Sequence, residues 1–166
     1  MPRSANAPAL SAACTCGRLR RAARALTQRY DDAMAPAGLR VTQFSLLRTL
    51  ARGGPARISE LAAQQLLDRT ALSRNLDPLL EQALVAVAPG RDARTREVEL
   101  TAKGAATLRR AENYWKEAQE EVARRIGKTR LAQLIAILGD LETLHPDREA
   151  GQSPKLVKAA ATTDLR

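Results

Sequence analysis

Apolar residues recur at spacings of three and four positions through most of the chain, which is the pattern of amphipathic helices. The first such stretch runs from about Cys14 to Ala35 and stops at Pro36 and Gly38. Five more helices are predicted: from Thr42 to Gly53, from Ser59 to Leu67, from Asp68 to Val85, from Thr101 to Gly127, and from about Thr129 to Leu144. Each of the four middle helices opens on a residue whose side-chain oxygen can cap it.

Two short runs, LVAVA and REVEL, interrupt this helical pattern and are predicted to be strands. The loop between them, PGRDARTR, carries three arginines. Pro78 lies inside the fourth helix and predicts a bend near Asp77. The order is helix, turn, polar and basic helix, then basic hairpin. That order is typical of a winged helix-turn-helix, so the expected fold is mainly α with a small β-hairpin wing.

The predicted winged unit needs only residues 39–101, and its leucines Leu72, Leu76, Leu79 and Leu80 are expected to pack inward. The first and the last two helices then present apolar stripes that their own chain does little to cover. A partner subunit would cover these stripes, and the two-fold dimer is the commonest oligomer. The predicted organisation is a flexible tail over 1–12, a dimerisation region over 13–38 and 102–145, the winged domain over 39–101, and a flexible tail over 146–166.

Composition supports a partner that is a polyanion. The 166 residues carry a net charge of +9, and aromatic residues make up only 2% of them, which argues against an RNA-stacking surface. No apolar run approaches the length of a membrane span, and the N-terminus lacks a signal-peptide core. A cytoplasmic protein without a cofactor or metal site is therefore expected. No arrangement of residues indicates an enzyme.

The candidate DNA-binding residues lie in two clusters. Arginine suits guanine and asparagine suits adenine through paired hydrogen bonds in the major groove, whereas a basic loop suits phosphate or the minor groove. The alternative is that both clusters are solvated surface. The first cluster, at the start of the fourth helix, is Arg69, Thr70, Ser73, Arg74 and Asn75, and the second, in the hairpin loop, is Arg91, Asp92, Arg94 and Arg96.

These pieces together resemble the MarR family of bacterial transcription regulators over about residues 15–144. The resemblance rests on GLRVTQFSLLRTLARGGPARISELAAQQLLDRTALSRNLDPLLEQALV, on the Asp-x-Arg of Asp92 and Arg94, and on the LT-x-x-G step of Leu100, Thr101 and Gly104. It implies a triangular homodimer in which each winged domain binds half of a palindromic operator. It also implies that Arg94 enters the minor groove while Asp92 orients the wing.

Two cysteines, Cys14 and Cys16, stand at the start of the first helix, where we expect their side chains to point to opposite sides. Cys16 begins a C-x7-R-x5-Y pattern that ends at Tyr30. This spacing resembles the organic-hydroperoxide-sensing branch of the family, which implies a redox role for Cys16 near Tyr30. The chain departs from that branch at Arg20 and Val41, where the branch has tyrosines. The alternative is two incidental thiols.

The sequence therefore predicts a homodimeric regulator that binds double-stranded DNA, represses transcription by occluding a promoter, and is released by an aromatic acid or an oxidant. Such an effector would act at the junction between the dimer helices and the winged domain. The rival hypothesis is an architectural nucleic-acid-binding protein without an effector. Three further residues, Tyr114, Trp115 and His145, are expected to be packing or helix-end residues.

Overall fold

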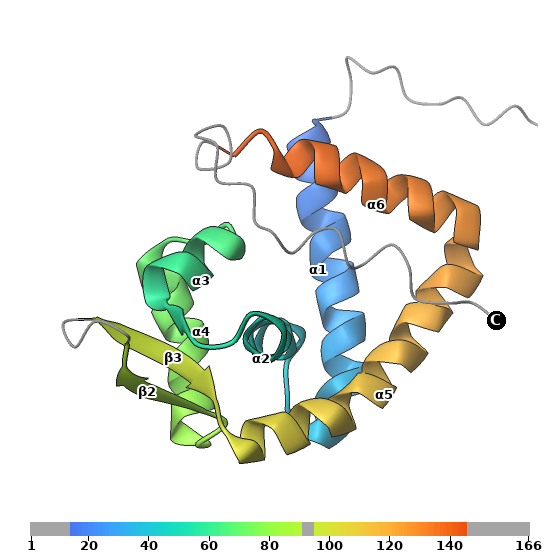
Figure 1. Cartoon of the computed structure of the whole chain (residues 1–166). Helices are drawn as coiled ribbons and strands as arrows, with labels where there is room; N and C mark the ends of the chain where they lie inside the picture. The colour runs from blue at the N-terminus through green and yellow to red at the C-terminus, as the bar shows by residue number, and fades with distance from the viewer. Residues whose placement is uncertain (1–13, 91–94, 146–166) are drawn as a thin grey trace, which may run out of the picture.

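The computed structural model describes residues 14–90 and 95–145, which form six α-helices, a short 3-10 helix and a small antiparallel sheet. This confirms the predicted mainly α fold with a hairpin wing. Figure 1 shows the sheet with α3 and α4 on one side of α2, and α1, α5 and α6 on the other. The elements are α1 (Thr15–Met34), η2 (Ala35–Ala37), α2 (Val41–Gly53), β1 (Ala56–Arg57), α3 (Ile58–Gln64), α4 (Arg69–Glu81), β2 (Val85–Pro89), β3 (Arg96–Leu100), α5 (Ala102–Ile126) and α6 (Lys128–Glu142).

The sheet has three strands in the order β1-β3-β2, one more than the sequence predicts. β2 and β3 pair antiparallel, with Val87 opposite Val98, and β1 adds to the other edge of β3 with Ala56 opposite Val98. β1 holds only two residues, which is too short for an alternating pattern to reveal. It joins the start of α3 to the wing, so the hairpin is part of the helical unit.

The starts of two helices differ from their predicted caps. α2 begins at Val41, where the backbone N–H of Arg40 donates to Gln43 Oε1 (2.8 Å), and Thr42 is not the cap. α3 begins at Ile58, and the N–H of Arg57 donates to Glu60 Oε2 (3.0 Å), so Ser59 is not the cap either. In both helices a long side chain in the first turn reaches back to the backbone, which removes the need for a short polar residue at the start.

One hydrophobic core joins the two regions that the sequence analysis separates. Met34 at the end of α1 and Leu108 and Ala111 on α5 are buried in the same cluster as the inward side chains of the winged unit. The prediction that the winged unit needs only residues 39–101 is therefore wrong for its core. The winged-unit members that are almost fully buried include Phe44, Leu46, Leu47, Leu61, Leu72, Leu79, Leu84 and Val98.

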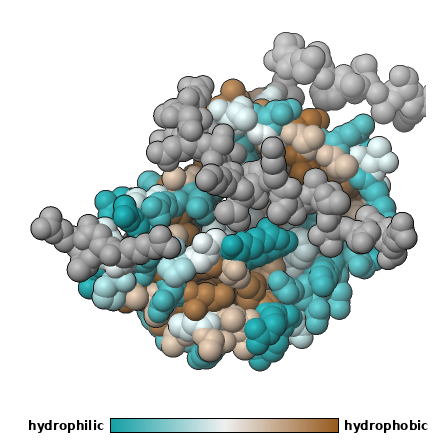
Figure 2. Space-filling model, in the orientation of Figure 1, coloured by the Kyte–Doolittle hydropathy of each residue, from teal (hydrophilic) through white to brown (hydrophobic). Residues whose placement is uncertain are grey.

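Apolar side chains remain exposed on α6, where no residue is buried. Ile135 is 56% exposed and Ile137 is 55% exposed, and Leu144 just beyond the helix is 70% exposed. Figure 2 shows apolar surface in the upper part of the view, where α6 lies. Leu80 on α4 is also exposed (37%), contrary to the inward position predicted for it. In residues 14–90 and 95–145, no helix is long and apolar enough to cross a membrane.

Candidate nucleic-acid interface

Helix α4 presents a polar face to solvent and an apolar face to the core. Asp68 caps it as predicted, because its Oδ1 accepts the N–H of Ala71 at 2.8 Å. The helix continues through Pro78 to Glu81. Its buried face is Leu72, Leu76 and Leu79, and successive residues turn by about 100° around the axis. Among residues 69–77 of α4, the exposed side chains are Arg69, Thr70, Arg74 and Asp77, and Ser73 is half-buried.

Asn75 is half-buried, as is Ser73, although the two lie about 160° apart around the helix. Asp77, which was not among the predicted DNA-binding residues, is also exposed on α4. The structure therefore exposes three of the five predicted residues of α4, leaves Ser73 and Asn75 half-buried, and adds an exposed carboxylate at Asp77. A cytosine amino group is the base atom that such a carboxylate suits.

The turn before α4 is fastened to α2 by one glutamine. Gln65 donates from Nε2 to Thr49 Oγ1 (3.1 Å) and accepts from Ser45 Oγ (3.2 Å). All three side chains are half-buried, so these bonds are partly shielded from water. Gln65 thus holds the turn that leads into the exposed face of α4. No sequence pattern indicates this role, because it depends on two hydroxyls from another helix.

The β2–β3 hairpin stands beside this helical unit as a wing. Pro89 pairs with Arg96 at its outer end, and the N–H of Gly90 donates to the carbonyl of Thr95 at 2.8 Å. Arg96 is exposed on the first residue of β3. Arg91, Asp92 and Arg94, the other predicted wing contacts, lie outside the described residues.

The predicted redox pair Cys16 and Tyr30 is not in contact within one chain. Fourteen residues of α1 separate them, or about 21 Å along the axis. Both cysteines are exposed, and Cys14 precedes the helix as its cap, with Sγ accepting the N–H of Gly17 at 3.4 Å. The expectation that both lie on one helix is therefore wrong for Cys14. Tyr30 is half-buried against the core, and burial raises the pKa of its phenol.

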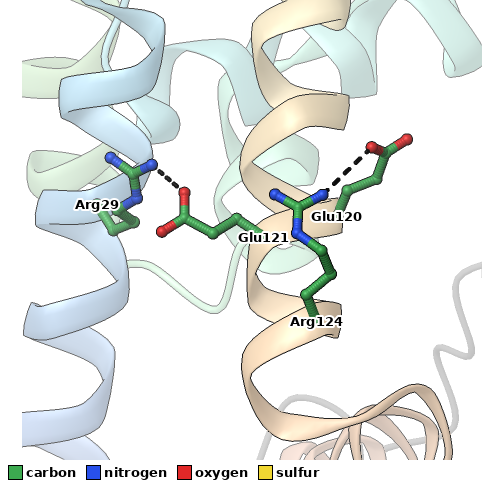
Figure 3. A network of polar contacts seen from close by, with 4 residues as sticks. All are labelled: Arg29, Glu120, Glu121 and Arg124. Carbon is green, nitrogen blue, oxygen red and sulfur yellow. Dashed lines mark hydrogen bonds and ion pairs between the residues drawn. The ribbon is translucent and has the colours of Figure 1, made fainter.

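Polar contacts join α1 to α5 near Tyr30. The Tyr30 hydroxyl donates to Gln119 Oε1, and Arg29 donates to Glu121, as Figure 3 shows for the ion pair. The Arg29 hydrogen bond holds the pKa of the Glu121 carboxyl below its ordinary value, and Glu121 in turn raises the pKa of Arg29. Both charged side chains are solvent-accessible, so the pair orients the helices more than it stabilises them.

Arg48 on α2 lies in an aromatic setting at the junction with α5. Its guanidinium carbon is 4.3 Å from the ring centre of Trp115 and 5.9 Å from that of Phe44, and the two rings stack 6.0 Å apart. Burial lowers the pKa of Arg48, and the nearby Arg52 lowers it further while Glu112 opposes both. Within the part of the chain that the structure describes, Arg48 has no ion pair or hydrogen bond. The sequence predicts a packing role for Trp115 and does not indicate the Arg48 cation beside its ring.

Comparisons with known proteins indicate the family to which this chain is related. The model of the MarR family matches residues 37–95. The transcriptional regulator MosR of M. tuberculosis, solved in complex with DNA, is 44% identical. The match covers 78% of this chain and 96% of that one, with a TM-score of 0.68. E. coli MarR in its apo form is 23% identical, over 78% of this chain and 98% of that one, with a TM-score of 0.63.

The repressor CouR, solved on a 23-mer DNA duplex, is 24% identical over 78% of this chain and 92% of that one, with a TM-score of 0.71. A search of curated protein sequences found no match. At these identities E. coli MarR and CouR establish the shared fold alone, whereas the identity to MosR over nearly all of its length establishes kinship. The chain therefore belongs to the MarR family of transcriptional regulators.

Proposed function

We propose that this protein is a homodimeric repressor that binds a palindromic duplex operator, with one α4 in the major groove of each half-site. The observation that carries this proposal is the polar face of α4, where Arg69, Thr70 and Arg74 are exposed and Ser73 is half-buried. Support comes from MosR of M. tuberculosis, which is 44% identical and was solved with DNA. A dimer on a promoter blocks polymerase, which makes repression the simplest consequence. A protein with this role acts in the cytoplasm.

Substitution of Arg74 tests whether α4 reads bases. The operator for this test is first selected from random duplexes. We expect Arg74→Ala to weaken binding to it by roughly 1–3 kcal/mol and to relax selectivity at one position of each half-site. Arg109→Ala is the matched control, because Arg109 is an exposed arginine on α5. Anisotropy titrations against the operator and a scrambled duplex measure both. Equal losses in the two variants would show that α4 contributes only charge, as an architectural binder requires.

The dimer in this proposal is formed by α1, α5 and α6. Leu26 on α1 is 38% exposed, and Ile135 and Ile137 on α6 are each more than half exposed. Apolar surface of this extent is a common mark of a protein interface. The two polar bridges between α1 and α5 set the angle of the helices that would carry it. We therefore keep the dimerisation region at 13–38 and 102–145 and the winged domain at 39–101.

We propose an aromatic carboxylate as one class of effector, because Arg48 offers a half-buried cation beside two aromatic rings where α2 meets α5. A ligand carboxylate would supply the ion-pair partner that Arg48 lacks among the described residues. Thermal-shift measurements with benzoate, and with benzyl alcohol as the uncharged control, test this. Benzoate should raise the melting temperature of wild type and not of Arg48→Met. A benzoate shift of the same size in the variant would contradict the role of Arg48.

The oxidant alternative rests on Cys16, which is exposed in the first turn of α1. An organic hydroperoxide would transfer its terminal oxygen to the thiolate, leaving an alcohol and a sulfenic acid that excess thiol reduces back with loss of water. Peroxide should abolish operator binding by wild type and Cys14→Ser but not by Cys16→Ser. Binding that survives peroxide in wild type would rule out this signal and leave the reversible ligand.

A further inference from the structure

The turn between α3 and α4 is tied to α2 by one side chain. Ser45 and Thr49 are four residues apart on α2, so their hydroxyls lie on the same face of that helix. Gln65 bridges them, because its Oε1 accepts from Ser45 at 3.2 Å and its Nε2 donates to Thr49 at 3.1 Å. Among the residues that the structure describes, no other side-chain hydrogen bond joins α2 to α3, to α4 or to this turn. We call these three side chains the Gln65 clamp.

The backbone hydrogen bonds of the turn reach α3 and leave its position against α2 open. The N–H of Gln65 donates to the carbonyl of Leu61 (3.0 Å), and the N–H of Leu67 donates to that of Ala62 (2.9 Å). Leu66, between them, has φ of 52°. Such a strained conformation persists only where the surrounding structure holds it in place. The Gln65 clamp acts on the residue directly before Leu66, so it helps to hold that conformation.

Apolar packing alone leaves the orientation of α4 loosely determined. This helix enters the core through Leu72, Leu76 and Leu79, which are buried leucines, and hydrophobic contact has no preferred direction. A hydrogen bond does have one, because it weakens steeply as its angle departs from linearity. Gln65 stands three residues before Asp68, the cap of α4. The Gln65 clamp therefore adds directional contacts close to the point where α4 begins.

Base readout needs more accurate placement of α4 than attraction to phosphate does. An arginine that pairs with guanine makes two hydrogen bonds, and both weaken when the helix rotates or shifts slightly. Attraction between charges acts over about 10 Å and tolerates such a shift. We propose that Gln65 is a positioning residue for base readout, and that the Gln65 clamp holds α4 at the angle at which Arg69 and Arg74 reach base edges. This inference rests on the proposed function.

Two sets of substitutions separate positioning from stability. Gln65→Met keeps an uncharged side chain of similar length and leaves both hydroxyls without this partner. The triple variant Ser45→Ala, Thr49→Val and Gln65→Met removes the polar groups together, which costs less stability than leaving some of them unpaired. Gln64→Met is the matched control, because Gln64 is a half-buried neighbour whose side chain makes no hydrogen bond within the described residues.

The readout is the ratio of the affinity for the selected operator to the affinity for a scrambled duplex, measured well below the melting temperature of every variant. Gln65→Met should weaken operator binding about tenfold, the size expected when one paired base contact is lost. Its binding to the scrambled duplex should stay unchanged, because that binding depends on charge. The triple variant should melt closer to wild type than Gln65→Met does and still show the reduced ratio, whereas Gln64→Met should behave as wild type.

Other results would overturn the inference. A wild-type ratio in Gln65→Met or in the triple variant would show that base readout does not depend on the Gln65 clamp. Equal weakening on both duplexes is what a smaller folded fraction produces, so it would show a role in stability alone. An equal fall of the ratio in Gln64→Met would assign the effect to the end of α3 and not to Gln65. A wild type that prefers no selected duplex would instead contradict the proposed function, and this inference would fall with it.

Discussion

Single residues hold strained backbone in the turn of the helix-turn-helix and just after its second helix. Leu66, after α3, has φ of 52°, and Ala83, after α4, has φ of 54°. Side chains other than glycine rarely adopt this left-handed region, at a cost of about 1 kcal/mol or more. At Ala83 the reason lies in its neighbours: its own N–H donates to Leu80 and the N–H of Leu84 donates to Leu79, which closes the end of the helix.

Replacing Ala83 by glycine should therefore stabilise the protein. We expect Ala83→Gly to raise the free energy of unfolding by about 0.5–1 kcal/mol, because glycine adopts the left-handed region without steric cost. Ala51→Gly is the matched control, an exposed alanine inside α2. It should lower stability by about 1 kcal/mol. Urea denaturation measures both, and a loss of stability at position 83 would show that its conformation carries no strain.

The sequence could predict caps at this scale only where a short side chain makes them. Asp68 and Thr101 accept hydrogen bonds from their own first turns, as their residue types indicate. The starts of α2 and α3 were misplaced because Gln43 and Glu60 supply the caps from inside the helix. Arg48 and Gln65 escaped notice because their partners lie on other helices. Such pairings depend on the three-dimensional packing and leave no local pattern.

Helices and strands could be predicted from the sequence where their pattern of apolar and polar residues repeats over many positions. All six α-helices and both wing strands stand close to their predicted places, since each buries a regular stripe or alternates across a sheet. The strand β1 was missed because two residues carry no period. The exposed face of α4 could be predicted by residue type but not residue by residue, because Ser73 and Asn75 are half-buried whereas Asp77 is exposed. Which of these side chains is exposed depends on burial in the folded protein, and the sequence alone does not give that burial.

The cap of α4 should matter at the scale of that element. Asp68→Ala removes the acceptor for the N–H of Ala71, and we expect it to lower the free energy of unfolding by about 1 kcal/mol. Asp68→Ser should lose much less, because serine caps equally well. Thermal unfolding of the three proteins gives the comparison. If Asp68→Ala were as stable as wild type, the start of α4 would be held by packing alone.

At the scale of the whole molecule, one core runs from the end of α1 through the winged unit to the first half of α5. The sequence separates these segments because they are distant along the chain, whereas the core joins Met34 to Leu108. Beyond that core, α6 and the first half of α1 stay outside and expose their apolar residues. The molecule therefore has one region whose apolar side chains are buried in the core and one region whose apolar side chains are exposed. We place the dimer contact in the second, uncovered region.

Charge on the uncovered region should break the dimer without unfolding the chain. Ile137 is 55% exposed, so Ile137→Asp should leave the monomer fold intact while burying a charge in the proposed interface. Ala136→Asp is the control, because Ala136 is exposed on another side of α6. Sedimentation equilibrium should give two chains for wild type and the control, and one for Ile137→Asp. A monomeric wild type at micromolar concentration would refute the dimer.

The most direct measurement is selection of bound duplexes from a random DNA library by the wild-type protein, followed by sequencing. The account predicts an inverted repeat whose half-site centres lie about 10–10.5 base pairs, or a multiple of this, apart, because two α4 helices related by a two-fold axis read the same groove face. Recovered sequences with no common motif, or with a single half-site and no partner, would contradict it.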